Sequence, residues 1–142
     1  MRRRSLVLIL LVAAAAFAVA GCGGGDSDKD KEAAGCGETP AAMTAAPQLP
    51  AQFPTPSGVT YTSQEKDGPT TKVSGHHDGD LDEAYDEYES ALDGKGGYSV
   101  TDKEKEKDDA EVNFSGHGTT GQVALKECDE DRTNVAITVR PA

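Results

Sequence analysis

The strongest pattern of apolar and polar positions lies in residues 81–92. Apolar side chains recur there at intervals of three and four positions, and acidic side chains occupy most of the others. This spacing predicts an amphipathic α-helix that turns one face toward a core. Asp80 is a suitable N-cap, and Gly94 is a suitable C-terminal stop. The apolar positions are Leu81, Ala84, Tyr85, Tyr88, Ala91 and Leu92.

Shorter segments on either side of this helix alternate apolar and polar residues with a period of two. Such alternation predicts β-strands with one face toward the core. Turn sequences separate several of them, as at Asp67-Gly68-Pro69 and Gly116-His117-Gly118. The predicted strands cover residues 59–64, 70–76, 98 onward, 110–115, 122–126 and 135–139.

The predicted order of elements is β-β-α-β-β-β-β over residues 58–142. Consecutive strands joined by short turns favour an antiparallel sheet. One amphipathic helix can cover one face of this sheet, which gives an α+β fold, a two-layer sandwich. Lysines and acids alternate in residues 102–107, and charged positions of this kind protect exposed sheet edges from pairing with other chains. We therefore interpret residues 102–107 as a solvated hairpin end.

A second apolar run occupies residues 6–20, after Arg2-Arg3-Arg4. It is about 15 residues long, whereas a helix needs about 20 to cross the hydrocarbon core of a bilayer. A short apolar run with a positive flank and small residues at its end predicts a targeting segment that is removed. The alternatives are an uncleaved membrane helix and an ordinary secretory signal.

The sequence Val19-Ala20-Gly21-Cys22 at the end of this run resembles the lipobox of bacterial lipoproteins. The resemblance implies a signal peptide over residues 1–21, cleavage before Cys22 and a diacylglycerol thioether on Cys22. Two acyl chains, such as palmitate, suffice for stable anchoring. The implied location is the cell membrane, with the protein lipid-anchored on the extracytoplasmic face. The Ala, Gly and Asp content is similar to that of lipoproteins from high-GC actinobacteria.

Residues 22–57 have the composition of a disordered tether. Residues 23–35 are mainly Gly, Asp, Lys and Ser, which cannot bury enough apolar surface to fold. Residues 37–57 contain five prolines, which favour extended polyproline II structure. We therefore expect three parts: the signal peptide, this tether, and a small α+β domain over residues 58–142.

The net charge of the chain disfavours two classes of partner. It is −11, and removal of residues 1–21 with their three arginines makes it about −14. Such an acidic surface is repelled by phosphate backbones and by anionic lipid headgroups. We therefore expect no nucleic-acid partner, and we expect contact with the lipid bilayer only through acylated Cys22.

The chain has three cysteines, of which two remain if Cys22 is acylated. An exported protein lies in an oxidising compartment, where disulfides persist. Cys36 and Cys128 then have only each other as partners. We predict a Cys36–Cys128 disulfide, worth about 4 kcal/mol in the chain-entropy model because it closes a loop of roughly 90 residues. The alternative is two free thiols.

One short segment holds several good metal ligands. His76, His77 and Asp78 suit zinc or a similar ion, but adjacent strand residues point to opposite faces of a sheet. A third ligand, such as His117, would have to come from another strand. The alternative, which we favour, is a polar strand end that leads into the helix N-cap.

The sequence carries no familiar catalytic motif. It has no Gly-x-Ser-x-Gly, P-loop or Rossmann fingerprint, and the acids of residues 81–92 fit the solvated side of a helix. We therefore expect no catalytic residue and no cofactor. Residues 58–142 resemble small secreted actinobacterial domains of unknown function, and this resemblance implies no activity.

Three hypotheses for function follow from these observations. The leading hypothesis is a membrane-anchored lipoprotein of the cell envelope that presents a small non-enzymatic binding domain. The alternative is a metal-binding envelope protein that uses the region of His76, His77 and Asp78. The third is a small hydrolase with an unfamiliar site.

Overall fold

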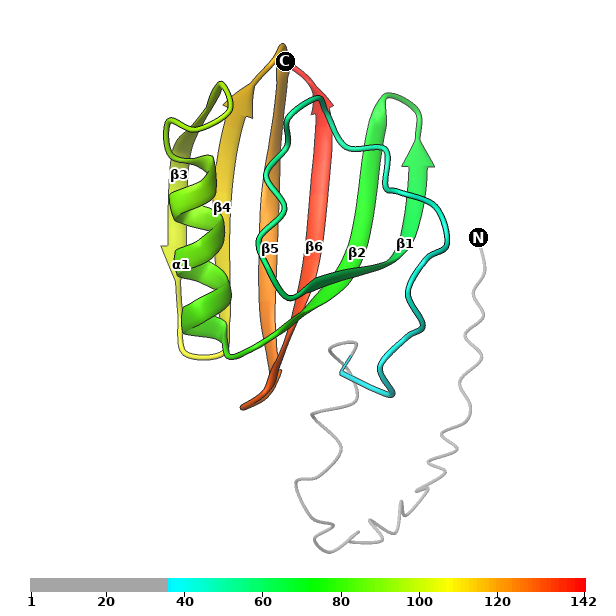
Figure 1. Ribbon diagram of the computed structural model, residues 1–142. Coiled ribbons are helices and arrows are strands. Elements are labelled where there is room, and N and C mark those ends of the chain that lie inside the picture. The colour runs from blue at the N-terminus through cyan, green and yellow to red at the C-terminus, as the bar shows by residue number, and fades with distance from the viewer. Residues whose placement is uncertain (1–35) are drawn as a thin grey trace, which may run out of the picture.

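The computed structural model describes residues 36–142, which form one sheet and one helix (Figure 1). The fold is α+β and dominated by the sheet, and the elements follow the predicted order. The predictions for the signal peptide, for Cys22 and for the first part of the tether lie outside the described residues. Within residues 36–142, no helix has the length and apolar character needed to cross a bilayer. The elements are β1 (Val59–Asp67), β2 (Thr70–Asp78), α1 (Leu81–Leu92), β3 (Tyr98–Lys105), β4 (Asp109–Gly116), β5 (Thr119–Asp129) and β6 (Arg132–Pro141).

The sheet has six strands in the order β1-β2-β6-β5-β4-β3, and all neighbouring strands are antiparallel. β3 to β6 form a meander, and β1 and β2 form a hairpin that joins the sheet beside β6. α1 carries the chain from β2 to β3, at the far edge of the sheet. This crossing places the helix over one face of the sheet (Figure 1).

The core lies between α1 and this face of the sheet. Alternate residues of the inner strands point toward the helix, and Val112, Val123 and Ile137 are fully buried there. The helix begins as predicted, because the Asp80 side chain accepts a hydrogen bond from the Glu83 backbone N–H at 2.8 Å. The buried helix residues are Leu81, Ala84, Tyr85, Tyr88 and Leu92.

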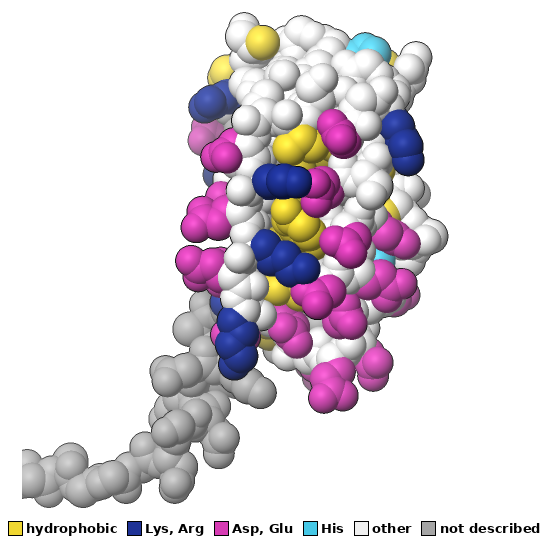
Figure 2. Space-filling view, turned by 90° about the vertical axis from the view of Figure 1, so that its left-hand side faces the viewer, with side chains coloured by type: hydrophobic (Ala, Val, Ile, Leu, Met, Phe, Trp, Pro, Cys, Tyr) yellow, Lys and Arg dark blue, Asp and Glu magenta, His cyan; other side chains and the backbone are white. Residues whose placement is uncertain are grey.

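Two lysines of the edge strand β3 pair with acids of α1. Lys103 pairs with Glu89, and Lys105 pairs with Asp82 at 2.6 Å. Hydrogen bonds to these carboxylates raise the pKa of both lysines. Figure 2 shows basic side chains lying over hydrophobic atoms on this side of the molecule. The sequence predicted a solvated hairpin end here, and residues 101–108 are exposed at the end of the β3–β4 hairpin. The period of two places both lysines on the helix side of β3, where they form these ion pairs.

Residues 36–57, here called the strap, form an extended segment before β1. Its second half crosses the same face of the sheet as α1 (Figure 1). Leu49 and Phe53 pack against the core. The centroid of the Phe53 ring lies 5.2 Å from that of Phe114 and 5.6 Å from that of Tyr98. The strap therefore completes the cover of a face that the helix covers only in part.

The strap differs from the predicted disordered tether over residues 22–57, for the part of that range that the structure describes. Prolines remove backbone donors but leave apolar side chains able to pack, and burial of a large one contributes roughly 1.5–3 kcal/mol. The Met43 backbone N–H also donates to the Tyr61 carbonyl of β1 at 2.8 Å. The folded part of the chain therefore begins before residue 58, where the sequence placed its boundary.

Candidate functional site

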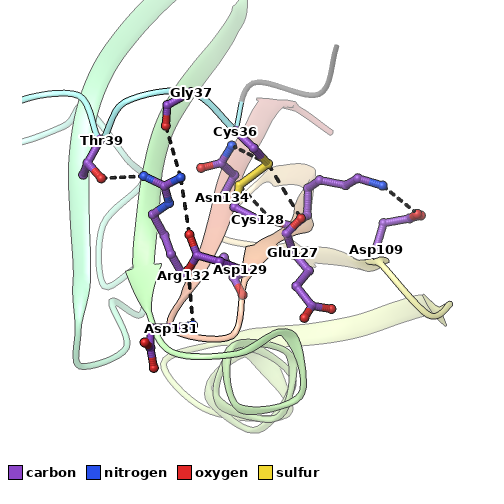
Figure 3. The surroundings of a disulfide bond; sticks show 12 residues. Cys36, Gly37, Thr39, Asp109, Glu127, Cys128, Asp129, Asp131, Arg132 and Asn134 are labelled. Atoms are coloured by element: carbon purple, nitrogen blue, oxygen red, sulfur yellow. Dashed lines mark hydrogen bonds and ion pairs between the residues drawn. A yellow bond between two sulfur atoms is a disulfide. The ribbon is translucent and has the colours of Figure 1, made fainter. Parts of the chain in front are cut away.

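The strap begins at the predicted disulfide (Figure 3). Cys36 is bonded to Cys128 of β5, which lies 92 positions later in the chain. Arg132, at the start of β6, donates to the Gly37 carbonyl at 3.1 Å and to the Thr39 hydroxyl. These links fix the start of the strap beside the turn between β5 and β6. The predicted pairing of Cys36 with Cys128 is confirmed.

A groove separates the second half of the strap from α1. Its volume is about 510 Å³, which lies within the range of small-molecule sites. One wall comes from the strap, the other comes from the helix, and the chain after the helix completes it. Its lining includes Pro54, Pro56, Ser57, Glu87, Ala91 and Lys95.

Contacts between the strap and the helical side close both ends of this groove. At one end, the Ser57 hydroxyl donates to Glu87 Oε1 at 3.3 Å. At the other end, Gly96 lies so near the strap that a Cβ atom there would be 3.1 Å from the Gln52 carbonyl oxygen. The groove is therefore short and bounded at its ends by these two contacts, and it is open to solvent.

Glu87 also reaches the sheet beneath the groove. Its Oε2 lies 3.4 Å from Nε2 of His77, whose side chain is only 2 % exposed. Burial raises the pKa of the neighbouring Tyr88 phenol, and the nearby Tyr61 raises it further. Glu87 thus touches the strap and the sheet from its place on the helix. The three residues Ser57, Glu87 and His77 do not form a catalytic triad, because the carboxylate rather than the imidazole stands in the middle.

The structure divides the predicted metal ligands of β2 between two faces of the sheet. His77 points toward Glu87 on the helix side, whereas His76 Nε2 lies 3.6 Å from Asp78 Oδ1 on the other face. This is the alternation expected of adjacent strand residues. The interpretation favoured from the sequence also describes the region, because Asp78 ends β2 and Asp80 caps α1.

His117 lies at the opposite end of the sheet from His77. Near its start, β6 pairs with β2 through Thr133, whose partner is His77. At its end, β6 pairs with β5 through Pro141, whose partner Thr119 follows the turn that contains His117. Among residues 36–142, no group of three His, Cys, Asp or Glu side chains could hold a metal ion. The structure therefore does not assemble the predicted ligand set.

Sequence reasoning missed the groove and the pairing of Glu87 with His77. Glu87 was assigned with the other acids to the solvated side of the helix. Its position three residues after Ala84 and four before Ala91 places it beside the apolar face, since residues at these intervals are neighbours on a helix. That signal could have marked Glu87 as partly buried, but it could not have identified the partner.

Comparison of the chain with protein-family models, with curated protein sequences and with solved structures finds no match.

Proposed function

We propose that this protein is a lipoprotein of the cell envelope, anchored through acylated Cys22 on the extracytoplasmic face of the membrane. Its folded part is a small non-enzymatic binding domain, and the groove beside α1 is its ligand site. The observation that carries the proposal is the Cys36–Cys128 disulfide. It accounts for two of the three cysteines, so Cys22, the residue that ends the lipobox-like sequence, is the cysteine outside the bridge.

The disulfide and the charge of the chain support the same location. Disulfides form and persist in oxidising compartments outside the cytoplasm. The chain after residue 21 has a net charge of about −14, which opposes contact of the protein surface with anionic headgroups. A lipid attached to the chain can hold such a protein at a membrane that its surface would avoid.

The disulfide also limits how far the folded part would lie from the lipid. Thirteen residues separate Cys22 from Cys36, and a chain of this length spans at most about 50 Å. Cys36 lies beside the turn between β5 and β6 (Figure 3), so the chain from the lipid would reach the folded part at this end of the sheet. Gly96, at the far end of the groove, contacts His117 in the turn between β4 and β5. The groove would therefore extend away from the end at which the tether joins the folded part.

The geometry supports binding rather than catalysis. Glu87 stands between Ser57 and His77, so the imidazole has no hydrogen bond through which it could take the hydroxyl proton of Ser57. The predicted metal ligands lie on two faces of β2 and at two ends of the sheet, so we do not extend the metal-binding hypothesis. The groove between the strap and α1 has a volume of about 510 Å³, which lies within the range of small-molecule sites.

The test of this function is the intact mass of the protein purified from its native membrane, measured before and after reduction. The proposal predicts a chain that begins at an acylated Cys22 and gains one hydrogen on each bridged sulfur upon reduction. The matched control is Cys22→Ser, which should lose the lipid and keep the same mass gain on reduction. A full-length chain without modification would refute the anchor.

A further inference from the structure

The two edges of the sheet are protected from pairing in different ways. β3, at one edge, carries Lys103 and Lys105, and charged side chains of this kind keep a sheet edge from pairing with another chain. β1, at the other edge, begins with residues 59–64, which are uncharged and have the sequence Val-Thr-Tyr-Thr-Ser-Gln. Both strands contain a β-bulge, so bulges do not account for the difference. The side chains at the start of β1 therefore give this edge little protection of their own.

The first half of the strap, residues 36–48, covers this edge. It passes beside β1 before the strap crosses the helix side of the sheet (Figure 1). The Met43 backbone N–H donates to the Tyr61 carbonyl at 2.8 Å, and the Gln48 backbone N–H donates to the Gln64 side chain at 2.5 Å. The strap therefore follows β1 and occupies a backbone acceptor that a partner strand would otherwise use.

This half of the strap is fixed mainly at its start. Residues 37–42 are exposed, and the residues of the strap that pack against the core lie in its second half. The start is held by the Cys36–Cys128 disulfide and by exposed hydrogen bonds from Arg132, which contribute little because water competes for the same groups. A segment with few buried contacts opens readily once its fixed end is released.

The disulfide is accessible to a thiol, because Cys36 and Cys128 are half-buried rather than enclosed. A dithiol reductant attacks one sulfur as a thiolate and forms a mixed disulfide with it. The second thiol of the reductant then displaces that cysteine, and the reductant leaves as its own disulfide. Two electrons and two protons pass to the chain, which retains Cys36 and Cys128 as free thiols.

We propose that the Cys36–Cys128 disulfide is a redox switch that controls the edge of β1. Its reduction by a dithiol releases residues 36–48 and opens this edge to a second copy of the chain. The two copies then pair antiparallel, β1 against β1. The second half of the strap stays on the core through its apolar residues, so the released chain remains folded. The inference goes beyond the proposed binding function and depends neither on the groove nor on the lipid.

The sequence of β1 favours a second copy as the partner. When Tyr61 of one copy lies opposite Tyr61 of the other, Val59 faces Ser63 and Thr60 faces Thr62. Uncharged residues then face each other throughout, and the charged residues 65–67 lie outside this stretch. Pairing about a two-fold axis gives a closed dimer, because the same patch is used on both copies.

The first measurement is amide hydrogen exchange of the ¹⁵N-labelled full chain in nonionic detergent, with and without dithiothreitol. Reduction should speed exchange of the Met43 amide by at least about tenfold, while the amides of α1 and of the inner strands stay protected. The same spectra show whether the reduced chain is folded. An unchanged rate at Met43 would show that the disulfide does not hold the strap on β1.

The second measurement is sedimentation equilibrium in density-matched detergent, which gives the association constant of the dimer. The double variant Cys36→Ser and Cys128→Ser has no thiol at either position, so it cannot form an intermolecular disulfide there. It should associate at least about tenfold more tightly than the disulfide-bonded chain, because the acceptor on β1 is free. If this variant does not fold, Met43→Pro removes the donor and keeps the bridge, and it should raise the association constant by about threefold.

A matched pair of lysine substitutions identifies the edge that pairs. Thr62 lies at the bulge of β1, and Thr101 lies at the bulge of β3. Each is replaced by lysine in the variant that dimerises. Thr62→Lys brings two lysines close together in the dimer and should return the association constant to that of the disulfide-bonded chain. Thr101→Lys should leave the constant within about twofold, because the other edge is distant and its charge is screened.

Two results of these association measurements would overturn the inference. One is an unchanged association constant in a folded variant whose strap is released. The other is an equal loss of association in Thr62→Lys and Thr101→Lys, which would place the contact away from β1. Neither result alters the intact mass of the acylated chain, so failure of the redox switch is distinguishable from failure of the anchor.

Discussion

The helix α1 and the strap cover the same face of the sheet by different physical means. The helix satisfies most of its own backbone hydrogen bonds and buries five side chains at helical spacing. The strap packs two hydrophobic side chains against the core, Leu49 and Phe53, and is otherwise held by the disulfide and by scattered hydrogen bonds. A segment without a repeating pattern can therefore complete a core when it has a few apolar anchors and one fixed end.

The groove exists because one cover of the sheet is the helix α1 and the other is the extended strap. Two helices that pack together interlock along their length, whereas an extended segment rich in proline has too few side chains to fill the space beside a helix. The gap remains where Ser90 and Ala91 face Pro54 and Pro56. The contrast between the two covers can be tested by removing what holds each of them.

Removal of the disulfide that holds the strap should lower the stability of the fold the most. The double variant Cys36→Ser and Cys128→Ser should lower the free energy of unfolding by about 4–5 kcal/mol, the chain-entropy value for a loop of this length. Guanidinium chloride unfolding measures the change, with Cys22→Ser as the control that keeps the bridge. An unchanged midpoint in the double variant would show that the bridge does not stabilise the fold.

The next largest effect should come from the core side of the helix. Leu92 is fully buried, and Leu92→Ala should cost about 3 kcal/mol through the lost transfer energy and the cavity left behind. Ser90→Ala, on the exposed side of the same turn, should cost less than about 0.5 kcal/mol. Urea unfolding of both variants gives the comparison, and equal costs would contradict the burial pattern of α1.

Removal of the main apolar anchor of the strap should have a smaller effect. Phe53 is only partly buried, and Phe53→Ala should cost about 2 kcal/mol, less than a fully buried phenylalanine. Native-state hydrogen exchange should show faster exchange in residues 43–53, with little change in α1. If the helix instead lost protection as much as the strap, the two covers would not be independent.

The smallest effect should come from the helix cap. Asp80→Ala removes the acceptor for the Glu83 backbone N–H and should cost about 1 kcal/mol, the usual value of an N-cap. Asp67→Ala, at the end of β1, removes an acid that caps no helix and serves as the control. Thermal unfolding measures the stability of both variants. A loss of stability in Asp80→Ala no larger than that in Asp67→Ala would show that the cap does not stabilise the fold.

The sequence predicted the features that depend on neighbouring residues or on the number of cysteines. The helix could be predicted because Leu81 to Leu92 repeat at helical spacing beside an N-cap, and the disulfide because two cysteines remained after Cys22. The strands are longer than predicted. For β5, the pattern predicted residues 122–126, whereas the strand extends over Thr119–Asp129. Polar residues at strand ends pair through their backbones, so side-chain alternation does not reveal them.

The strap and the groove could not be predicted because their signals depend on distant partners. Leu49 and Phe53 are isolated apolar residues among prolines, and only the sheet they pack on distinguishes them from a tether. Likewise, the sequence alone does not distinguish Glu87 from the other acids of α1, because its partner His77 belongs to β2. Strand order was also open, since the pairing of β2 with β6 joins segments more than fifty positions apart.

The most direct test of this account is the environment of Phe53 in the disulfide-bonded full chain. If the strap packs on the sheet, the Phe53 ring protons should give nuclear Overhauser cross-peaks to those of Tyr98 and Phe114, whose ring centroids lie 5.6 Å and 5.2 Å away. A Phe53 ring with random-coil shifts and no such cross-peaks would contradict the account, because the strap would then be a tether and the groove would have only one wall.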